Sequence, residues 1–306
     1  MIVYREIGSL ENDLGFSLKT LYAISNNIKN HYVSVEIPKK NGELRRLSVP
    51  DEILKRVQRR ISDVILSRLE ISEYATAYRY GASTVKNAAV HVGKPKLLKL
   101  DILHFFDSVY YSTLRERVFT RERFSDNVSI LLSMLCYFGD KLPQGAPTSP
   151  SITNVIMREF DEKIGAFCRE KGISYTRYCD DMTFSGDFDE REIISLVKSE
   201  LLKNGFVLNN KKTRLISACQ RQTVTGVVVN RKPNIQAEYR RKLRQEIYYC
   251  QKCGADEHAK HIGEADTDSY LRSLLGRISY ALQVCPGDKK MKDAKRQIIK
   301  IIKERV

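Results

Sequence analysis

Two adjacent aspartates, Asp180 and Asp181, interrupt a stretch that otherwise favours β-structure, SYTRYCDDMTFSG (174–186). With Cys179 they fall at the reversal of the expected hairpin. Aspartate is common in turns because its carboxylate bonds nearby backbone groups and because it tolerates unusual dihedral angles. Taken alone, the stretch therefore favours an ordinary polar turn. Two neighbouring negative charges also repel each other, and a bound divalent cation would convert that repulsion into affinity.

A third carboxylate favours the metal interpretation. Asp101 ends the apolar run LLKLD, which is typical of a buried strand. In the sheet that we predict, this strand lies beside the hairpin, so three carboxylates surround one point. Their oxygens suit two Mg²⁺ ions, with Mn²⁺ as a substitute. Two such ions about 3.5–4 Å apart activate an attacking hydroxyl and stabilise a leaving pyrophosphate. Without metal, we expect a raised pKa for one of the adjacent pair.

The elements that must position these residues follow an α+β order. The expected elements are a strand at 96–101, a helical region at 112–138, a helix at 151–172, the aspartate hairpin at 174–186, a helix at 190–205 and a strand at 206–209. This is the order of a ferredoxin-like sheet that helices cover on one face.

Basic segments flank this core on both sides. Residues 35–50 predict a hairpin that turns at Asn41-Gly42. Apolar residues at helical spacing predict a helix over 50–69. Five cations lie among them: Lys55, Arg56, Arg59, Arg60 and Arg68. From about residue 236 the sequence is mainly helical and strongly basic.

The composition is that of a folded, basic protein. The chain has 306 residues, of which 42% are hydrophobic, and a formal net charge of +15. Such a charge attracts polyanions, so nucleic acid is the first candidate partner. We expect no membrane partner, because no apolar run approaches about 20 residues and the N-terminus lacks the pattern of a signal peptide. Seven cysteines without a regular framework favour reduced thiols and a cytoplasmic location.

Five segments resemble, in the family's order, the motifs of reverse transcriptases, which are RNA-directed DNA polymerases. They are LRRLSVP (the basic fingers motif), KLDILHFFDSV (the first catalytic motif), LPQGAPTSP (the loop under template and incoming nucleotide), YCDD (the Y-x-D-D motif) and LNNKKTRL (the lysine motif). Two more, NAAVH and VTG, are similar to motifs of bacterial retron reverse transcriptases. Together the motifs span about residues 45–226.

The resemblance implies a metal site and a right-hand polymerase. Asp101, Asp180 and Asp181 would bind the ions, with the carbonyl of Ile102 completing a shell. The domains would be fingers at 1–95, a palm at 96–235 with a helical fingers-side insertion at about 110–148, and a small thumb at 236–306. The implied reaction is attack of a hydroxyl on the α-phosphate of a deoxynucleotide, with two Mg²⁺ ions.

Other matched residues would contact the nucleotide. Phe106, five residues after Asp101, would exclude a 2′-hydroxyl, whereas the alternative is a core phenylalanine, as expected for Phe105. Gln144 and Gly145 would let the backbone approach the nascent base pair.

For two of the predicted cationic roles, a neighbouring residue is an alternative candidate. Arg45 would grip the triphosphate in a fork, with Arg46 as the adjacent alternative. Lys212 would give a proton to pyrophosphate, although Lys211 lies beside it and either lysine is otherwise a solvated charge.

The retron motifs and the C-terminal segment imply contacts with RNA. The candidate residues are Asn87, His91, Thr225, Arg240, Arg241 and Arg244. For Asn87 and His91 the alternative is an ordinary helical surface. The implied partners are a cognate structured non-coding RNA, its cDNA product, deoxynucleotides and an effector protein in an anti-phage system. Competing interpretations are a group II intron-like or abortive-infection reverse transcriptase, and a non-catalytic RNA-binding scaffold.

Two cysteines and two histidines lie within a short C-terminal span, as in a zinc knuckle. They are Cys250, Cys253, His258 and His261. The cysteine pair also fits the end of an amphipathic helix, and the family resemblance does not imply zinc, so we do not expect a zinc site.

Overall fold

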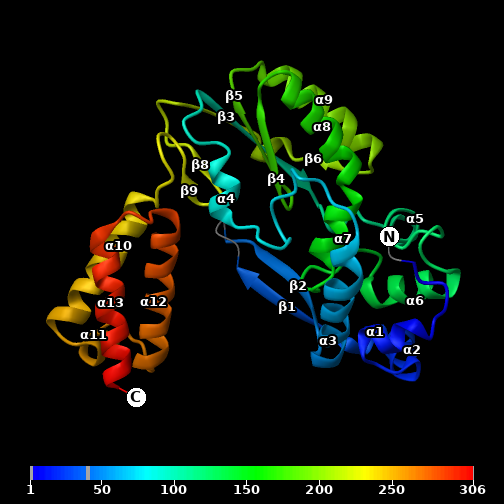
Figure 1. Cartoon of the computed structure of the whole chain (residues 1–306), viewed down its shortest axis with the longest axis horizontal. Helices are drawn as coiled ribbons and strands as arrows, with labels where there is room; N and C mark the ends of the chain where they lie inside the picture. The colour runs from blue at the N-terminus through cyan, green and yellow to red at the C-terminus, as the bar shows by residue number, and fades with distance from the viewer. Residues whose placement is uncertain (1–2, 39–41, 306) are drawn as a thin grey trace. The chain divides into compact units, whose positions relative to one another are not determined.

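The computed structural model describes residues 3–38 and 42–305 (Figure 1). By internal packing the chain divides into two compact units. The first unit comprises 1–82 and 98–215, and the second comprises 83–97 and 216–306. The predicted fingers, palm and thumb boundaries stay a prediction. The packing itself groups 83–97 and 216–235 with the C-terminal helices.

The first unit contains the five-stranded sheet that carries the aspartates. Its strands run in the order β4-β5-β3-β6, and a fifth strand, β7, also pairs with β3. The strands are β3 (Lys96–Leu103), β4 (Ser174–Tyr178), β5 (Asp181–Gly186), β6 (Val207–Leu208) and β7 (Arg214–Ser217). β4 and β5 form an antiparallel hairpin in which Tyr178 faces Asp181. The predicted strand, hairpin and α+β class are confirmed.

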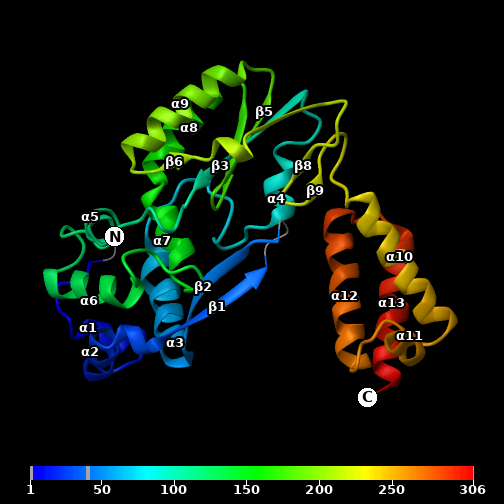
Figure 2. The ribbon, with the colours of Figure 1, turned by 180° about the vertical axis from the view of Figure 1, so that it is seen from behind.

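Helices cover one face of this sheet, as the sequence predicts. α8 (Arg158–Glu170) packs on β4, α9 (Glu190–Lys203) packs on β6, and the two helices contact each other. Both are visible beside the strands in Figures 1 and 2. The segment expected as one helix over 151–172 is two, α7 (Ser149–Ile156) and α8, because Met157 has ψ near 1° and breaks the helical path.

The remaining helices of the first unit contribute to its hydrophobic core. They are α1 (Ser9–Leu14), α2 (Leu18–Asn26), α3 (Glu52–Arg60), α5 (Tyr111–Arg117) and α6 (Asp126–Cys136). Asp51 caps α3 by accepting from the Leu54 amide. The helix expected over 50–69 is regular only to Arg60, where a π-turn (Ile61–Ile65) and a 3-10 turn (Leu66–Arg68) replace it.

An antiparallel ribbon projects from the start of α3. β1 (Tyr32–Pro38) and β2 (Leu44–Pro50) pair so that Ile37 faces Arg45. The predicted hairpin is confirmed, whereas Asn41 of its predicted turn lies outside the described residues. The Ser48 amide donates to the Gln144 carbonyl at 2.8 Å. This bond fixes the ribbon against the predicted nucleotide loop.

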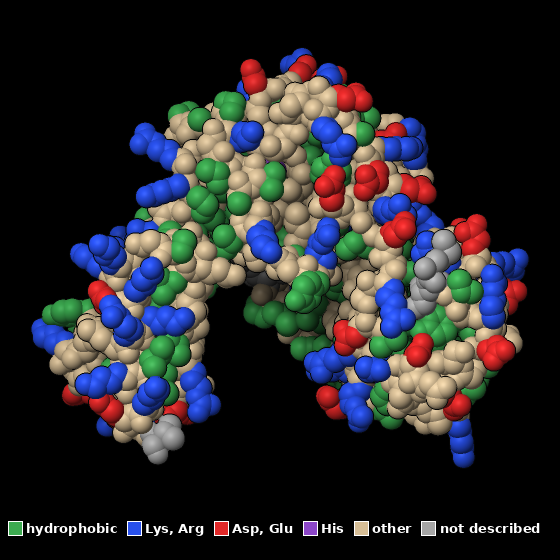
Figure 3. All heavy atoms as spheres, in the orientation of Figure 1, with side chains coloured by type: hydrophobic (Ala, Val, Ile, Leu, Met, Phe, Trp, Pro, Cys, Tyr) green, Lys and Arg blue, Asp and Glu red, His purple; other side chains and the backbone are tan. Residues whose placement is uncertain are grey.

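The second unit combines a short helix, a small hairpin and four C-terminal helices. Its elements are α4 (Thr84–Ala89), β8 (Thr223–Val224), β9 (Val227–Val228), α10 (Ala237–Lys252), α11 (Ala255–His261), α12 (Thr267–Val284) and α13 (Lys289–Glu304). Leu243, Leu274 and Ile298 lie in their shared core. Figure 3 shows Lys and Arg side chains spread over the visible face of the C-terminal helices. Within 3–38 and 42–305, no helix has the length and apolar character to cross a bilayer.

Candidate active site

Asp101 and the aspartate pair are brought together by a backbone bond between neighbouring strands. The Ile102 amide donates to the Asp180 carbonyl at 3.1 Å. Because side chains alternate along a strand, this bond sets which face the Asp101 carboxylate occupies. Asp101 is only 4% exposed. Three carboxylates that are far apart in the sequence therefore line one cleft, as the sequence predicts.

A fully buried arginine supports the turn that carries the pair. Arg177 and Asp161 are both 0% exposed, and their Nη2 and Oδ2 atoms are 2.6 Å apart. Tyr175 donates to the same carboxylate. Arg177 Nη1 donates to the Cys179 carbonyl at 2.9 Å, and Cys179 has φ of 61°, in the left-handed region. A buried ion pair thus fixes the backbone beside Asp180.

The electrostatics of the pair are those expected without metal. Burial, and then the charges of Asp181 and Asp101, raise the pKa of Asp180. Burial also raises the pKa of Asp181, against the opposing charge of Lys99. The expected raised pKa is therefore found in both members of the pair. Bringing a divalent cation to these oxygens would remove the cost of their mutual repulsion.

Two further side chains hold the Asp101 carboxylate. Lys212 Nζ lies 2.7 Å from Oδ2, and the hydrogen bond raises the lysine pKa. Asn209 Nδ2 donates to Oδ1 at 2.9 Å, and the Asn209 amide donates to the Asp101 carbonyl. Of the two candidate lysines, Lys212 lines the cleft and Lys211 does not.

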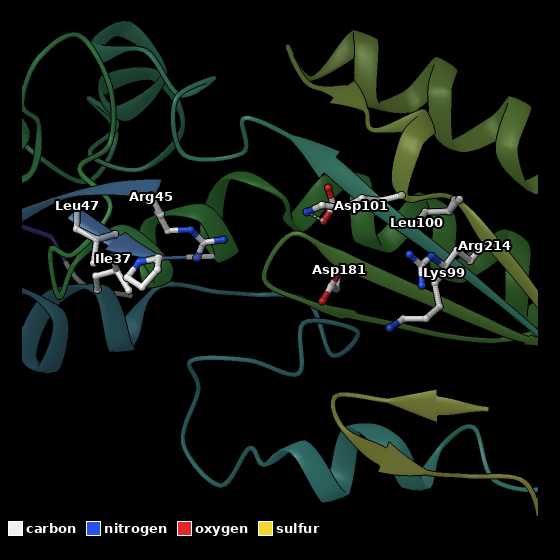
Figure 4. Close-up of a pocket in the computed structure, with 10 residues that line it drawn as sticks. Ile37, Arg45, Leu47, Lys99, Leu100, Asp101, Asp181 and Arg214 are labelled. Atoms are coloured by element: carbon white, nitrogen blue, oxygen red, sulfur yellow. Dashed lines mark hydrogen bonds and ion pairs between the residues drawn. The ribbon is translucent and has the colours of Figure 1, made fainter. Parts of the chain in front are cut away.

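The cleft has a volume of about 840 Å³ and gathers most of the predicted nucleotide contacts. Arg45, Arg46, Ile102, Phe106 and Gln144 line it together with the three aspartates. Phe106 is half-buried at its wall, whereas Phe105 is buried and packs against Phe206 with ring centroids 5.4 Å apart. In Figure 4, Arg45 reaches from β2 toward the side of the cleft that holds Asp101 and Asp181.

Position 145 requires glycine because of its backbone conformation and because the ribbon approaches it closely. Its φ is +122°, and an added Cβ would lie 2.8 Å from the Ser48 carbonyl oxygen. We expect Gly145→Ala to destabilise the protein by about 1–3 kcal/mol and to impair deoxynucleotide use. Thermal unfolding and the KM for deoxynucleotide measure the two effects. Gly276→Ala, in α12 with open space around it, is the control and is expected to maintain stability. Equal stability of the two variants would contradict the expectation.

The donor set fits a divalent cation in its chemistry. Three carboxylates with a neighbouring backbone carbonyl provide the hard oxygen ligands that Mg²⁺ prefers. Within the described ranges, no three His, Cys, Asp or Glu side chains are already gathered into a metal-binding group. The ammonium of Lys212 instead holds Asp101. Binding an ion would therefore require the lysine and the carboxylates to rearrange.

Sequence reasoning missed several side chains that shape the site. Asn209 and Arg177 give no spacing signal, because their partners lie 108 and 16 residues away. Tyr78 also lines the cleft and is 55% exposed. Partial loss of solvent, and then the neighbouring Cys179, Tyr178 and Asp180, raise its pKa to about 12. The sequence does offer one signal for Arg177, because a charged side chain is unusual in a strand as apolar and aromatic as SYTRY.

The two retron-type motifs meet inside the second unit. Thr225 Oγ1 donates to the Thr84 carbonyl at 2.9 Å, and Asn87 Nδ2 donates to Thr225 Oγ1 at 3.4 Å. Asn87 is 1% and His91 is 0% exposed. The expected alternative of an ordinary helical surface is therefore wrong, because α4 packs on β8 and β9. Direct contact of these three residues with RNA stays a prediction.

The burial of His91 predicts a pH dependence of stability. Burial, and then the charge of Lys94, lower its pKa from 6.5 to about 3. The unfolded chain therefore binds more protons between these values, so stability falls as the pH drops below about 6.5. We expect His91 to account for about 2 kcal/mol of stability loss between pH 8 and pH 5.

Urea unfolding at several pH values measures the effect of His91. His91→Gln is expected to flatten the profile over this window. His261→Gln, which removes an exposed histidine of α11, is expected to leave it unchanged. The same slope in both variants would contradict the assignment.

The predicted RNA contacts on α10 have different surroundings. Arg241 and Arg244 are exposed, whereas Arg240 is half-buried and donates to Asn234. Tyrosines of the C-terminal helices differ in the same way, because Tyr248 of α10 is exposed and Tyr270 of α12 is buried in the helical core. Exposed cations and rings on one helix suit phosphate and base contacts.

The four cysteine and histidine candidates are not gathered as ligands. Cys250 and His258 are buried, and Cys253 and His261 are exposed. Cys250 Sγ lies 3.5 Å from the Tyr270 hydroxyl, and the His258 ring stacks on Tyr249. These contacts place the two buried side chains within the packing of α10, α11 and α12.

Comparison with known proteins identifies relatives over most of the chain. The family described as "Reverse transcriptase (RNA-dependent DNA polymerase)" matches residues 37–240. The Retron Ec83 reverse transcriptase of Escherichia coli is 33% identical over 237 residues, which cover 71% of this chain and 75% of that protein. The Retron Mx65 reverse transcriptase of Myxococcus xanthus is 32% identical over 276 residues, and the match covers 84% of this chain but only 62% of the relative.

A solved structure of a foamy viral protease-reverse transcriptase in complex with double-stranded DNA is also similar. The similarity has a TM-score of 0.48 at 12% identity, and it covers 99% of this chain and 49% of that chain.

Proposed function

Because this chain belongs to the reverse transcriptase (RNA-dependent DNA polymerase) family, we propose that it copies RNA into DNA as a retron-type enzyme. The sheet of the first unit is then the palm of a right-hand polymerase. One observation carries the proposal. The bond from the Ile102 amide to the Asp180 carbonyl joins the strand of Asp101 to the aspartate turn, and all three carboxylates line one cleft.

Reverse transcriptases use divalent metal ions, and we propose that Asp101, Asp180, Asp181 and the Ile102 carbonyl hold two Mg²⁺ ions. When bound, the ions favour ionisation of the attacking hydroxyl and stabilise the leaving pyrophosphate. Mn²⁺ has the same preference for oxygen ligands and is expected to substitute.

Residues around the cleft orient the nucleotide and supply a proton to the leaving pyrophosphate. Arg45 binds triphosphate oxygens through its fork of N–H donors. Phe106 occupies the space of a 2′-hydroxyl and so selects deoxynucleotides. Gln144 and Gly145 support the nascent base pair. Lys212, once released from Asp101, delivers a proton to the leaving pyrophosphate.

The partners of the proposed reaction are nucleic acids and deoxynucleotides. We propose that a cognate structured non-coding RNA serves as template and that a cDNA is the product; similarity to proteins named retron reverse transcriptases supports this choice. The exposed cations of α10, with Arg241 and Arg244 among them, bind RNA phosphates. An effector protein and a role in phage defence belong to the same proposal.

Purification of the protein with its bound nucleic acid tests this function. We expect the co-purified RNA to be a single structured species and to support incorporation of labelled deoxynucleotides when Mg²⁺ is present. RNase treatment before the assay, omission of the metal, or supply of ribonucleotides alone should each remove the signal. RNA that co-purifies without supporting any incorporation would favour a non-catalytic scaffold.

A further inference from the structure

A second hollow of about 770 Å³ adjoins the catalytic cleft and shares four lining residues with it: Arg45, Asp101, Asp181 and Lys212. Its lining continues past these carboxylates to two cations, Lys99 and Arg214, which do not line the cleft. Apolar side chains of the ribbon and of β3 complete its walls: Ile37, Pro38, Leu47 and Leu100. The hollow therefore combines positive charge with an apolar surface.

The two cations are held by the sheet. Lys99 and Asp101 are two residues apart on β3, so their side chains share a face of that strand. Arg214 begins β7, which pairs with β3. In Figure 4, Lys99 and Arg214 lie together on one side of the carboxylates, and Arg45 lies on the other. The sheet thus places positive charge on one side of the aspartates, and the ribbon places it on the other.

The charges of Lys99 and Arg214 are not used by any ion pair among the described residues. Lys212, in contrast, is bound to Asp101 at 2.7 Å, and Arg46 pairs with Glu36. Lys99 acts on Asp181 through space and opposes the rise of its pKa. Arg214 is exposed, so its guanidinium is accessible to a ligand. Guanidinium and ammonium groups that face a hollow and lack acidic partners suit phosphate oxygens.

We propose that Lys99 and Arg214 bind a backbone phosphate of the strand that supplies the attacking hydroxyl. This inference rests on the proposed function. The triphosphate of the incoming nucleotide is assigned to the side of Arg45, so a phosphate on the opposite side of the carboxylates belongs to the other reactant. Two cations there offset the repulsion between that phosphate and the aspartates. The apolar walls leave room for the sugar and base of the terminal nucleotide.

Neutralising single phosphates of a primer tests this assignment. The substrate is a DNA primer annealed to an RNA template, with one uncharged methylphosphonate linkage at each of the last few positions in turn. For the wild type, we expect one linkage near the primer end to lower kcat/KM for primer extension by about tenfold or more. In the double variant Lys99→Met/Arg214→Met, the same linkage is expected to change the rate by less than about twofold. The KM for deoxynucleotide is expected to stay the same.

A double variant with the same loss of charge is the control. Arg191→Met/Lys198→Met removes two exposed cations of α9 that line neither hollow, and this variant should respond to methylphosphonate as the wild type does. An equal methylphosphonate penalty in the wild type and in Lys99→Met/Arg214→Met, or a loss confined to the deoxynucleotide KM, would overturn the phosphate assignment alone. Failure of the wild type to extend any primer would overturn the proposed function and this assignment with it.

Discussion

Replacement of Asp101 by asparagine is expected to lower deoxynucleotide incorporation by at least about a thousandfold. The substitution keeps the size of the side chain and removes the charge that would bind a cation. Asp101 is 4% exposed, and Asn209 and Lys212 hold its two oxygens in place at the cleft. Single-turnover incorporation on co-purified RNA measures the effect.

The same loss is expected for Asp180→Asn combined with Asp181→Asn, while the bound RNA is retained. Because the pKa of each residue is raised by burial and by negative neighbours, their removal should not unfold the metal-free protein. Asp63→Asn, an exposed site in the π-turn, is the control and should keep full activity. Retention of more than about a tenth of the activity by Asp101→Asn would contradict the assigned role.

The second large effect is expected from Arg177, whose ion pair with Asp161 lies entirely in the core. Arg177→Met leaves the Asp161 carboxylate buried without its cation. Breaking one side of such a pair costs about 3–5 kcal/mol. The Cys179 carbonyl also loses its donor, so the aspartate turn loses support. The free energy of unfolding in urea measures the loss.

A double variant separates the role of charge from the role of packing. Arg177→Met/Asp161→Leu removes both charges and is expected to recover much of the lost stability. Its incorporation rate should remain low, because nothing then holds the Cys179 carbonyl. Lys171→Met, which breaks an exposed pair with Glu192, is the control and should change stability little. Equal stability of Arg177→Met and the control would contradict this account.

The sequence predicts the meeting of the aspartates because it depends on the order of elements. An apolar strand that ends in Asp101 and a hairpin that turns at Asp180 become neighbours in a ferredoxin-like sheet. The contacts that hold those carboxylates cannot be predicted from the order of elements. Asn209 reaches Asp101 from 108 residues away, through the short strand β6 and the turn that follows it. Only the folded sheet shows that contact.

The motif NAAVH shows a different limit of sequence reasoning. Three polar or small residues on a short helix are compatible with an exposed face, yet α4 packs on β8 and β9, and Asn87 bonds Thr225, which lies 138 residues further along the chain. Tertiary packing therefore decides whether Asn87 and His91 are exposed. The sequence does not determine where helices end either. The apolar pattern continues to Leu69, but a π-turn interrupts the helix after Arg60.

Binding of Mn²⁺ to the wild type and to Asp101→Asn/Asp181→Asn tests the central claim most directly. The electron paramagnetic resonance signal of free Mn²⁺ counts the bound ions in the presence of deoxynucleotide and a primer–template. The account predicts tight binding by the wild type and loss of that binding in the double variant. The same number of ions bound with the same affinity by both proteins would contradict the shared carboxylate site.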